Sequence, residues 1–167
     1  PTVLARHGTR RWLATRNTML RIGRNLFVHA GLSARLLERD LEMDTLNARM
    51  SEGLYRTSKE RREDPTLEFL YRSAGPVWYR GMVCTDEKYD PLTPEQTDAL
   101  LRRYNADRLL VGHTIFPDIS TFHDGRVIAV NVQNELNRRK NRGRAVLIEG
   151  SRISVVGNRG VKRVLEE

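Results

Sequence analysis

The chain has 167 residues, of which 39% are hydrophobic and 30% are charged, a composition typical of one globular domain rather than of a collagenous or disordered chain. The longest apolar runs are far shorter than the roughly 20 residues needed to cross a bilayer, so we expect no membrane span. The formal net charge is +8, and a single cysteine, Cys84, excludes both an intramolecular disulfide and a zinc cluster built on cysteines.

The sequence begins at Pro1 rather than at a methionine, and residues 1–11 lack the apolar stretch of a signal peptide. We therefore expect the chain to be a fragment of a longer protein. The lone cysteine is compatible with a reducing compartment, and we predict a cytoplasmic protein.

The first predicted element is a strand over residues 2–8 that carries the tripeptide Arg-His-Gly at its end. Histidine phosphatases carry this tripeptide and use the histidine as phosphoryl acceptor, which makes His7 a candidate nucleophile. Such enzymes also need a second histidine late in the chain, and neither His113 nor His123 lies in the context that they show. An exposed histidine in a linker explains the same residues, so a histidine phosphatase is the least favoured alternative.

Residues 25–31, Asn-Leu-Phe-Val-His-Ala-Gly, predict a buried strand that ends at His29. A broken helix is predicted over residues 33–59, with Ser33 as its N-cap. The dipeptide Asp-Pro at residues 64–65 opens a further helix, which ends near residue 71.

Residues 77–82, Val-Trp-Tyr-Arg-Gly-Met, are predicted to be extended. Their aromatic side chains could clamp the stem of Arg80, and a guanidinium held in this way binds phosphate oxygens through two hydrogen bonds. A surface arginine packed on an aromatic ring fits the same residues equally well.

The clearest helix begins with Thr-Pro-Glu-Gln at residues 93–96, where threonine and glutamine form a capping box, and ends near residue 104. A second apolar strand follows at residues 108–114 and ends at His113. If this strand is parallel to the strand of residues 25–31, both histidines lie at one edge of a sheet and could share a cation, for which imidazole is a suitable ligand. Two core histidines at strand ends would show the same spacing, and no acidic cluster precedes His29.

The remainder is predicted to be β structure, which makes the fold class α/β in a single domain over residues 1–167. One hairpin joins residues 119–122 to 126–132 and contains His123 as an exposed turn residue. A second hairpin joins residues 145–148 to 153–156, and a frayed, charged end follows residue 157.

The densest basic run is Arg-Arg-Lys-Asn-Arg-Gly-Arg at residues 138–144. It contains no aromatic residue that could stack on a base, so a solvated loop is favoured and nucleic acid is not an expected partner. A noncatalytic basic module that binds acidic protein or RNA through this run is the main alternative to an enzyme.

Taken in order, residues 25–33, 75–81 and 110–114 resemble three consecutive motifs of calcineurin-like metallophosphoesterases, most closely those of the Shewanella-like protein phosphatase branch. Residues 8–17 also resemble a segment of that branch, which would make the nearby His7 unrelated to catalysis. The resemblance extends over residues 8–132. It implies a two-sheet β-sandwich with mixed strands flanked by helices, of which this chain supplies the C-terminal half.

The resemblance also implies a two-metal centre of manganese, iron or zinc, with His29 and His113 as ligands of the same ion and Arg80 as the residue that binds the substrate phosphate. The implied reaction is the hydrolysis of phosphomonoesters, with a phosphoprotein favoured over a small phosphoester as substrate. The earlier motifs of the family, which supply the other metal ligands, are absent, and residues 130–133 depart from its pattern. We therefore expect weak metal binding and exposed apolar surface in this chain alone, and a truncated, inactive remnant is a further alternative.

Overall fold

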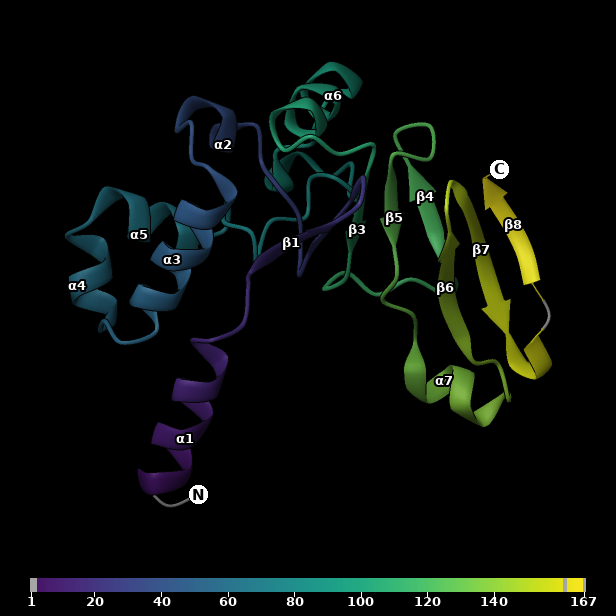
Figure 1. The fold of residues 1–167 in the computed structure, drawn as a ribbon, viewed down its shortest axis with the longest axis horizontal. Coiled ribbons are helices and arrows are strands. Elements are labelled where there is room, and N and C mark those ends of the chain that lie inside the picture. The colour runs from purple at the N-terminus through teal and green to yellow at the C-terminus, as the bar shows by residue number, and fades with distance from the viewer. Residues whose placement is uncertain (1–2, 161, 167) are drawn as a thin grey trace.

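The structure is a computed structural model that describes residues 3–160 and 162–166, with the side chains of residues 3–7, 134, 159 and 166 outside the description. It has a mixed α/β fold, in which helices lie along one side of a five-stranded sheet and a three-stranded sheet lies along the other (Figure 1). The elements are α1 Val3–Leu13, β1 Met19–Ile22, β2 Asn25–Val28, α2 Arg35–Glu38, α3 Met43–Gly53, α4 Ser58–Arg62, α5 Pro65–Tyr71, η1 Glu87–Tyr89, α6 Pro94–Arg103, β3 Arg108–Val111, β4 Ser120–Phe122, β5 Val127–Ala129, α7 Asn134–Arg139, β6 Arg144–Glu149, β7 Arg152–Gly157, η2 Asn158–Gly160 and β8 Lys162–Glu166.

The larger sheet has the strand order β1-β2-β3-β5-β4. Its three central strands, β2, β3 and β5, are parallel, whereas the edge strands β1 and β4 are antiparallel to their neighbours. The register pairs Val28 of β2 with Val111 of β3, so both strands end at the same level. Residues that follow β2 and β3 are therefore brought side by side.

The two faces of this sheet bury different clusters, because successive side chains of a strand point to opposite faces. Leu109 and Val111 face the helices and share a core with residues of α2, α3, α5 and α6. Leu110 and Ile128 face the other way and pack against Ile153 of β7 in the smaller antiparallel sheet β6-β7-β8. Two sheets thus pack face to face, with helices on the outer side of the larger one.

Local capping signals in the sequence are confirmed. The side chain of Asp64 accepts hydrogen bonds from the first backbone N–H groups of α5, and Pro65 occupies the first turn. At the start of α6, Thr93 and Gln96 form the reciprocal hydrogen bonds of a capping box. Both predicted β-hairpins are also present.

Several predicted elements were wrong. Residues 3–7, predicted as a strand, belong to α1, because a short apolar run fits a helix as well as a strand. The helix predicted over residues 33–59 is broken, as expected, but into three helices, since Asp40 adopts a left-handed conformation with φ of 46° and Thr57 caps a new helix. Ser33 caps none of them, and its hydroxyl donates instead to the carbonyl oxygen of Ala74.

The segment that carries Arg80 is not extended as predicted. The backbone N–H groups of Trp78 and Tyr79 both donate to the carbonyl oxygen of Gly75, which makes a tight turn. The end of the chain is not frayed either, because β8 pairs with β7 and completes the smaller sheet.

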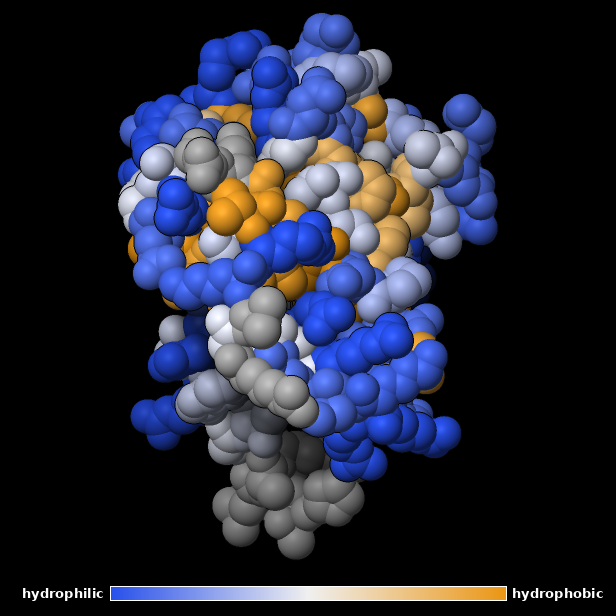
Figure 2. Space-filling view, turned by 90° about the vertical axis from the view of Figure 1, so that its right-hand side faces the viewer, coloured by the Kyte–Doolittle hydropathy of each residue, from blue (hydrophilic) through white to orange (hydrophobic). Residues whose placement is uncertain are grey.

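On the side that carries this sheet, apolar side chains are exposed among charged ones (Figure 2). Within the described residues, no helix is both long and apolar enough to span a membrane.

Candidate active site

Two imidazole rings meet at the carboxyl ends of β2 and β3. Nε2 of His29 lies 3.1 Å from Nδ1 of His113, and the ring centroids are 5.0 Å apart. The backbone fixes this approach, because the N–H of Gly112 donates to the carbonyl oxygen of His29 over 2.8 Å and so extends the parallel pairing by one residue. The predicted pair of histidines is therefore assembled by strand register.

The backbone around His113 has an uncommon conformation. His113 has a φ of 60°, and the N–H of Thr114 donates to the carbonyl oxygen of Gly112 over 2.7 Å, so the chain reverses within three residues. Non-glycine residues with positive φ are uncommon, and tight turns of this kind concentrate at functional sites. The turn directs the His113 ring toward His29 rather than along the strand.

The surroundings of His113 favour its neutral form. Burial lowers the pKa of its imidazole, and electrostatic interactions with Arg80 and His29 lower this pKa further. The neutral imidazole is the form that ligates a metal ion, because a ring nitrogen must be free of its proton to donate an electron pair.

Arg80 completes the group of predicted site residues. Its Nη1 donates to the hydroxyl of Thr114 over 3.3 Å, which ties the arginine to the loop that carries His113. Within the described residues no carboxylate forms an ion pair with Arg80. Arg80 is half-buried and no described carboxylate is paired with it, which suits the binding of a phosphate anion.

Two contacts hold the arginine loop against the histidines. The N–H of Ala30 donates to the carbonyl oxygen of Pro76 over 3.0 Å, and the ring of Trp78 stands edge-on to that of His113 with centroids 5.6 Å apart. A Cβ on Gly31 would lie 3.0 Å from the carbonyl oxygen of Tyr79, so a larger residue at this junction would require its neighbours to shift. Sequence reasoning missed Trp78 and Thr114 as site residues, although each lies within two positions of a predicted one.

The histidine pair fits part of a metal site. Two nitrogens that each lie about 2.1 Å from one ion, at an angle between about 90° and about 110°, are separated by about 3.0–3.4 Å. The 3.1 Å between the two ring nitrogens falls within this range. Nε2 of His113 is buried and has no hydrogen-bond partner among the described residues, whereas a ligating histidine normally donates its other N–H to an acceptor. The described side chains include no group of three or more acidic, cysteine or histidine residues that could hold a metal ion, so His29 and His113 would supply two ligands of a larger set.

The remaining histidines do not join this site. The prediction that His123 is exposed was wrong: its side chain is half-buried, with Nδ1 3.2 Å from the Thr97 hydroxyl and Nε2 3.1 Å from the carbonyl oxygen of Met82. It ties α6 to the loop after Arg80 and is a structural residue. The backbone of His7 lies in α1, and its side chain lies outside the described part of the structure.

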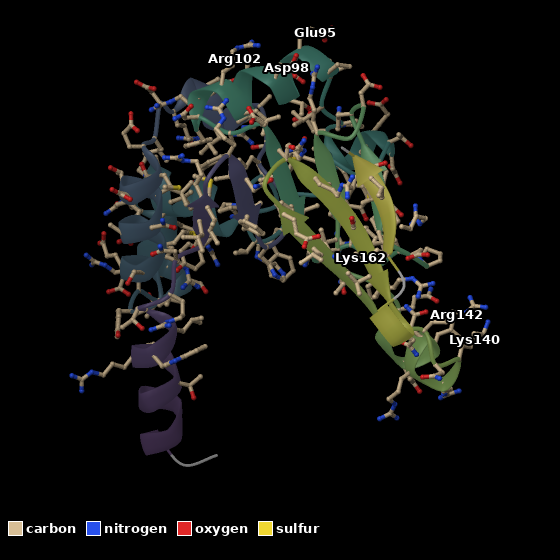
Figure 3. All side chains as sticks on the ribbon, turned by 45° about the vertical axis from the view of Figure 1, so that its right-hand side comes forward. Glu95, Asp98, Arg102, Lys140, Arg142 and Lys162 are labelled. Atoms are coloured by element: carbon tan, nitrogen blue, oxygen red, sulfur yellow. The ribbon has the colours of Figure 1, made fainter. Side chains whose placement is uncertain are left out.

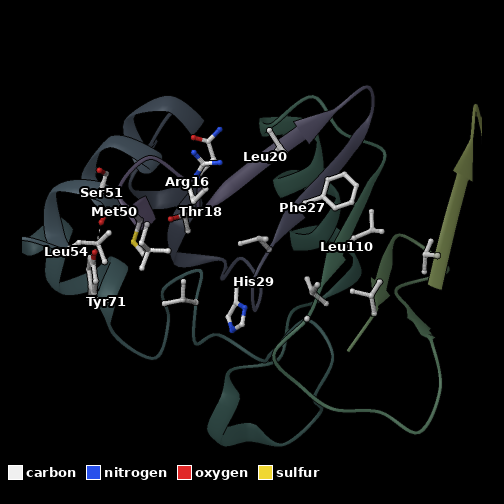
Figure 4. Close-up of a pocket in the computed structure, with 18 residues that line it drawn as sticks. Arg16, Thr18, Leu20, Phe27, His29, Met50, Ser51, Leu54, Tyr71 and Leu110 are labelled. Carbon is white, nitrogen blue, oxygen red and sulfur yellow. Dashed lines mark hydrogen bonds between the residues drawn. The ribbon is translucent and has the colours of Figure 1, made fainter. Parts of the chain in front are cut away.

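An open apolar hollow of about 790 Å³ extends from His29 between the larger sheet and α3 (Figure 4). His29 lies at its margin, and Leu20, Phe27 and Leu110 line the sheet side. The predicted exposure of apolar surface is thus present beside the candidate site.

The basic run lies elsewhere. Lys140 and Arg142 project from the turn between α7 and β6, at the opposite end of the molecule from the labelled residues of α6 (Figure 3). Two arginines of the run are engaged in ion pairs, Arg139 with Glu135 and Arg144 with Asp118. Part of the charge of this run is therefore neutralised within the protein.

The fold is similar to that of solved phosphatases. No protein-family model matches the chain, and no curated protein sequence matches it. Among solved structures, a cold-active protein tyrosine phosphatase is similar with a TM-score of 0.83 and 28% sequence identity, over 94% of this chain and 44% of that one.

Two further structures agree with it. A point mutant of a cold-active protein tyrosine phosphatase, and the cold-active protein tyrosine phosphatase of a psychrophilic Shewanella species, each have a TM-score of 0.82 and 28% identity over 93% of this chain and 45% of theirs. This chain therefore spans less than half the length of the phosphatases it resembles. The predicted resemblance to a phosphatase is confirmed at this level, whereas the calcineurin-like family, the metal ligands and the role of Arg80 stay predictions.

Proposed function

We propose that this chain carries the C-terminal half of a phosphomonoesterase active site of the calcineurin-like type, and that the enzyme dephosphorylates phosphoproteins. The observation that supports this most is the convergence of His29, His113 and Arg80 at the ends of two parallel strands. The similarity to protein tyrosine phosphatases over 94% of this chain favours phosphotyrosine as the substrate group.

In this proposal His29 and His113 hold one divalent ion, manganese, iron or zinc, of a pair whose other ligands come from residues beyond those described. When bound, such a pair neutralises phosphate charge and lowers the pKa of water so that water can attack phosphorus. Burial of His113 lowers the pKa of its imidazole and so favours the neutral form, which is the form that ligates a metal ion.

Arg80 has the second role. Its guanidinium would donate two parallel hydrogen bonds to non-bridging oxygens of the phosphate, and these bonds strengthen as negative charge grows on those oxygens during the reaction. The Thr114 hydroxyl and the turn at Gly75 hold the arginine in place before substrate binds, so little reorganisation is needed. Trp78, which is 55% exposed and stands against His113, offers an aromatic surface for the ring of the substrate tyrosine.

The test is hydrolysis of p-nitrophenyl phosphate by the full-length gene product, with and without manganese, beside its His29→Ala and Arg80→Ala variants and the isolated 167-residue chain. Arg102→Ala is the matched control, because Arg102 is an exposed arginine on α6. We expect manganese-dependent turnover that both site variants lose and the control keeps, with the isolated chain inactive. Turnover that is independent of metal and survives His29→Ala would refute the proposal.

A further inference from the structure

A second hollow, of about 700 Å³, has Arg80 in its wall. Trp78 belongs to this wall too and contacts His113, so the hollow adjoins the candidate active site. The rest of the wall comes from α2, the segment after α5, and η1. We call this hollow the basic pocket and define it by Arg35, Arg72, Arg80, Lys88 and Tyr89.

The charge of the basic pocket is strongly one-sided. Four cationic side chains line it, whereas Asp90 is the one carboxylate among the residues of its wall that the structure describes. Arg35 forms no ion pair with any described residue, and its nearest aromatic contact is with the Phe69 ring, 5.9 Å away. An open site with unneutralised positive charge attracts anionic groups.

The other two cations of the pocket, Lys88 and Arg72, form ion pairs that are exposed to solvent. Lys88 is paired with Asp86 at 2.8 Å and Arg72 with Glu68 at 3.3 Å, and all four side chains are largely exposed to solvent. Ion pairs of this kind contribute little to stability, so both cations can turn to a ligand carboxylate at small cost.

An aromatic ring forms part of the same wall. The Tyr89 ring lies 4.8 Å from Nζ of Lys88 and 5.9 Å from the guanidinium carbon of Arg80, so it connects the two cations. The position of η1 is fixed because the hydroxyl of Tyr79 donates to the carbonyl oxygen of Asp90. The pocket is therefore built on a fixed loop next to the arginine that is proposed to bind phosphate.

From this arrangement we propose that the basic pocket binds acidic side chains that flank the phosphorylated residue of a protein substrate, and so gives the enzyme a preference for acidic phosphopeptides. The inference rests on the proposed function, because it uses Arg80 as the phosphate site. With the phosphate on Arg80, carboxylates of neighbouring substrate residues meet Arg35 and Lys88. A substrate with neutral flanks would leave these charges unpaired.

The experiment measures the binding of fluorescent peptides to the full-length gene product. Each peptide carries a non-hydrolysable phosphonate analogue of phosphotyrosine, flanked either by Glu and Asp or by Gln and Asn. We expect the acidic peptide to bind about three- to tenfold more tightly at low salt, as for one or two partly exposed charge pairs, and the preference to shrink at high salt. In the double variant Arg35→Gln/Lys88→Gln the ratio of the two dissociation constants, neutral peptide over acidic peptide, falls to nearly one. In the control Arg102→Gln this ratio is unchanged.

A charge-reversal variant, Arg35→Glu/Lys88→Glu, adds a positive prediction, because it should favour a Lys-flanked peptide over the acidic one. Thermal unfolding of each variant verifies that it is folded. Equal binding of acidic and neutral peptides by the wild-type protein overturns the inference, and so does a preference that survives the double variant. Turnover of p-nitrophenyl phosphate by the wild-type protein separates the two proposals. If the protein shows no turnover but still prefers acidic peptides through Arg35 and Lys88, the proposed phosphatase activity is refuted and the binding preference stands.

Discussion

Nε2 of His29 and Nδ1 of His113 lie 3.1 Å apart although 84 residues separate them in the sequence. The two imidazoles contact each other, and the ring of Trp78 contacts that of His113. The parallel pairing of β2 with β3 sets the positions of both histidines. The backbone hydrogen bond from Gly112 to His29 extends this pairing to the residues at the ends of the two strands. The sheet therefore positions the two histidines, and a separate loop brings Arg80 next to them.

The first prediction concerns the shape of the Arg80 side chain. Replacement of Arg80 by lysine keeps the charge but removes the planar fork that matches two phosphate oxygens. We expect kcat/KM for p-nitrophenyl phosphate to fall by about 10- to 100-fold, or about 1.4–2.7 kcal/mol of transition-state stabilisation. Steady-state kinetics on the full-length gene product would measure this, with Arg102→Lys as control. A lysine variant as fast as the wild type would show that charge alone suffices.

A related prediction concerns Thr114, which accepts a hydrogen bond from Arg80. Thr114→Val removes the acceptor of the 3.3 Å hydrogen bond from Arg80 and leaves the shape of the side chain almost unchanged. One neutral acceptor of a hydrogen bond from a charged group accounts for about 1.5 kcal/mol, so we expect a loss of about tenfold in kcat/KM. In the double variant with Arg80→Lys the two losses should not add, because both act through the position of the same cation.

The second prediction concerns Gly81, which follows the arginine. A Cβ at this position would lie well inside contact distance of the Tyr79 hydroxyl and of the carbonyl oxygens of Tyr89 and Asp90. Backbone atoms cannot move aside cheaply, so Gly81→Ala should lower the free energy of unfolding by about 1–3 kcal/mol in urea titrations. Gly8→Ala is the control, because nothing lies within 4 Å of its added methyl group and alanine is the better helix former. Equal stability of the two variants would contradict the packing at Gly81.

The sequence was sufficient where structure depends on neighbouring residues. The helix starts at Asp64 and Thr93 were predicted because a capping side chain bonds to backbone groups only two or three positions away. The strands that end at His29 and His113 were found for a similar reason, since a short apolar run closed by glycine is a local signal.

Long-range contacts decided the features that the sequence left open. The sequence did not predict whether β2 and β3 pair in parallel, because the residues of a single strand do not determine the order of strands in a sheet. The basic pocket around Arg35 and Lys88 was missed, since its residues come from separate elements. The strand β8 was missed because its charged residues resemble a solvated tail until β7 offers a pairing edge.

The third prediction uses the pH dependence of stability at Asp64. The hydrogen bond from Arg49 lowers the pKa of this carboxyl group, and the backbone N–H of Leu67 lowers it further. A carboxyl group with a lowered pKa stabilises the folded state above its unfolded pKa of about 3.9, and this contribution is lost as the pH falls through the folded pKa.

Asp64→Asn isolates that contribution, because asparagine is an equally good helix cap. At neutral pH we expect the variant to be less stable by about 0.5 kcal/mol, the size typical of a partly exposed ion pair. The difference should disappear as the pH falls below about 3.9 in thermal unfolding experiments. Glu63→Gln is the control, because Glu63 is the neighbouring exposed carboxylate and Asp64 is the residue that caps α5; this variant should change stability at neither pH. A destabilisation that is the same at acid and neutral pH would exclude the Arg49 pair as its cause.

The last prediction concerns the apolar hollow beside His29. When residues 1–167 are expressed alone, Leu20, Phe27 and Leu110 line an open space of about 790 Å³, and a solvent-exposed apolar surface of this kind binds hydrophobic dyes and promotes association. We expect the chain to enhance the fluorescence of anilinonaphthalene sulfonate, and Leu20→Gln to reduce this enhancement because Leu20 is already 43% exposed and tolerates a polar side chain. Leu136→Gln, a leucine of similar exposure on α7 outside the hollow, is the matched control. If both variants bind the dye equally well, the dye does not report on the hollow and the sheet beside His29 is covered in solution.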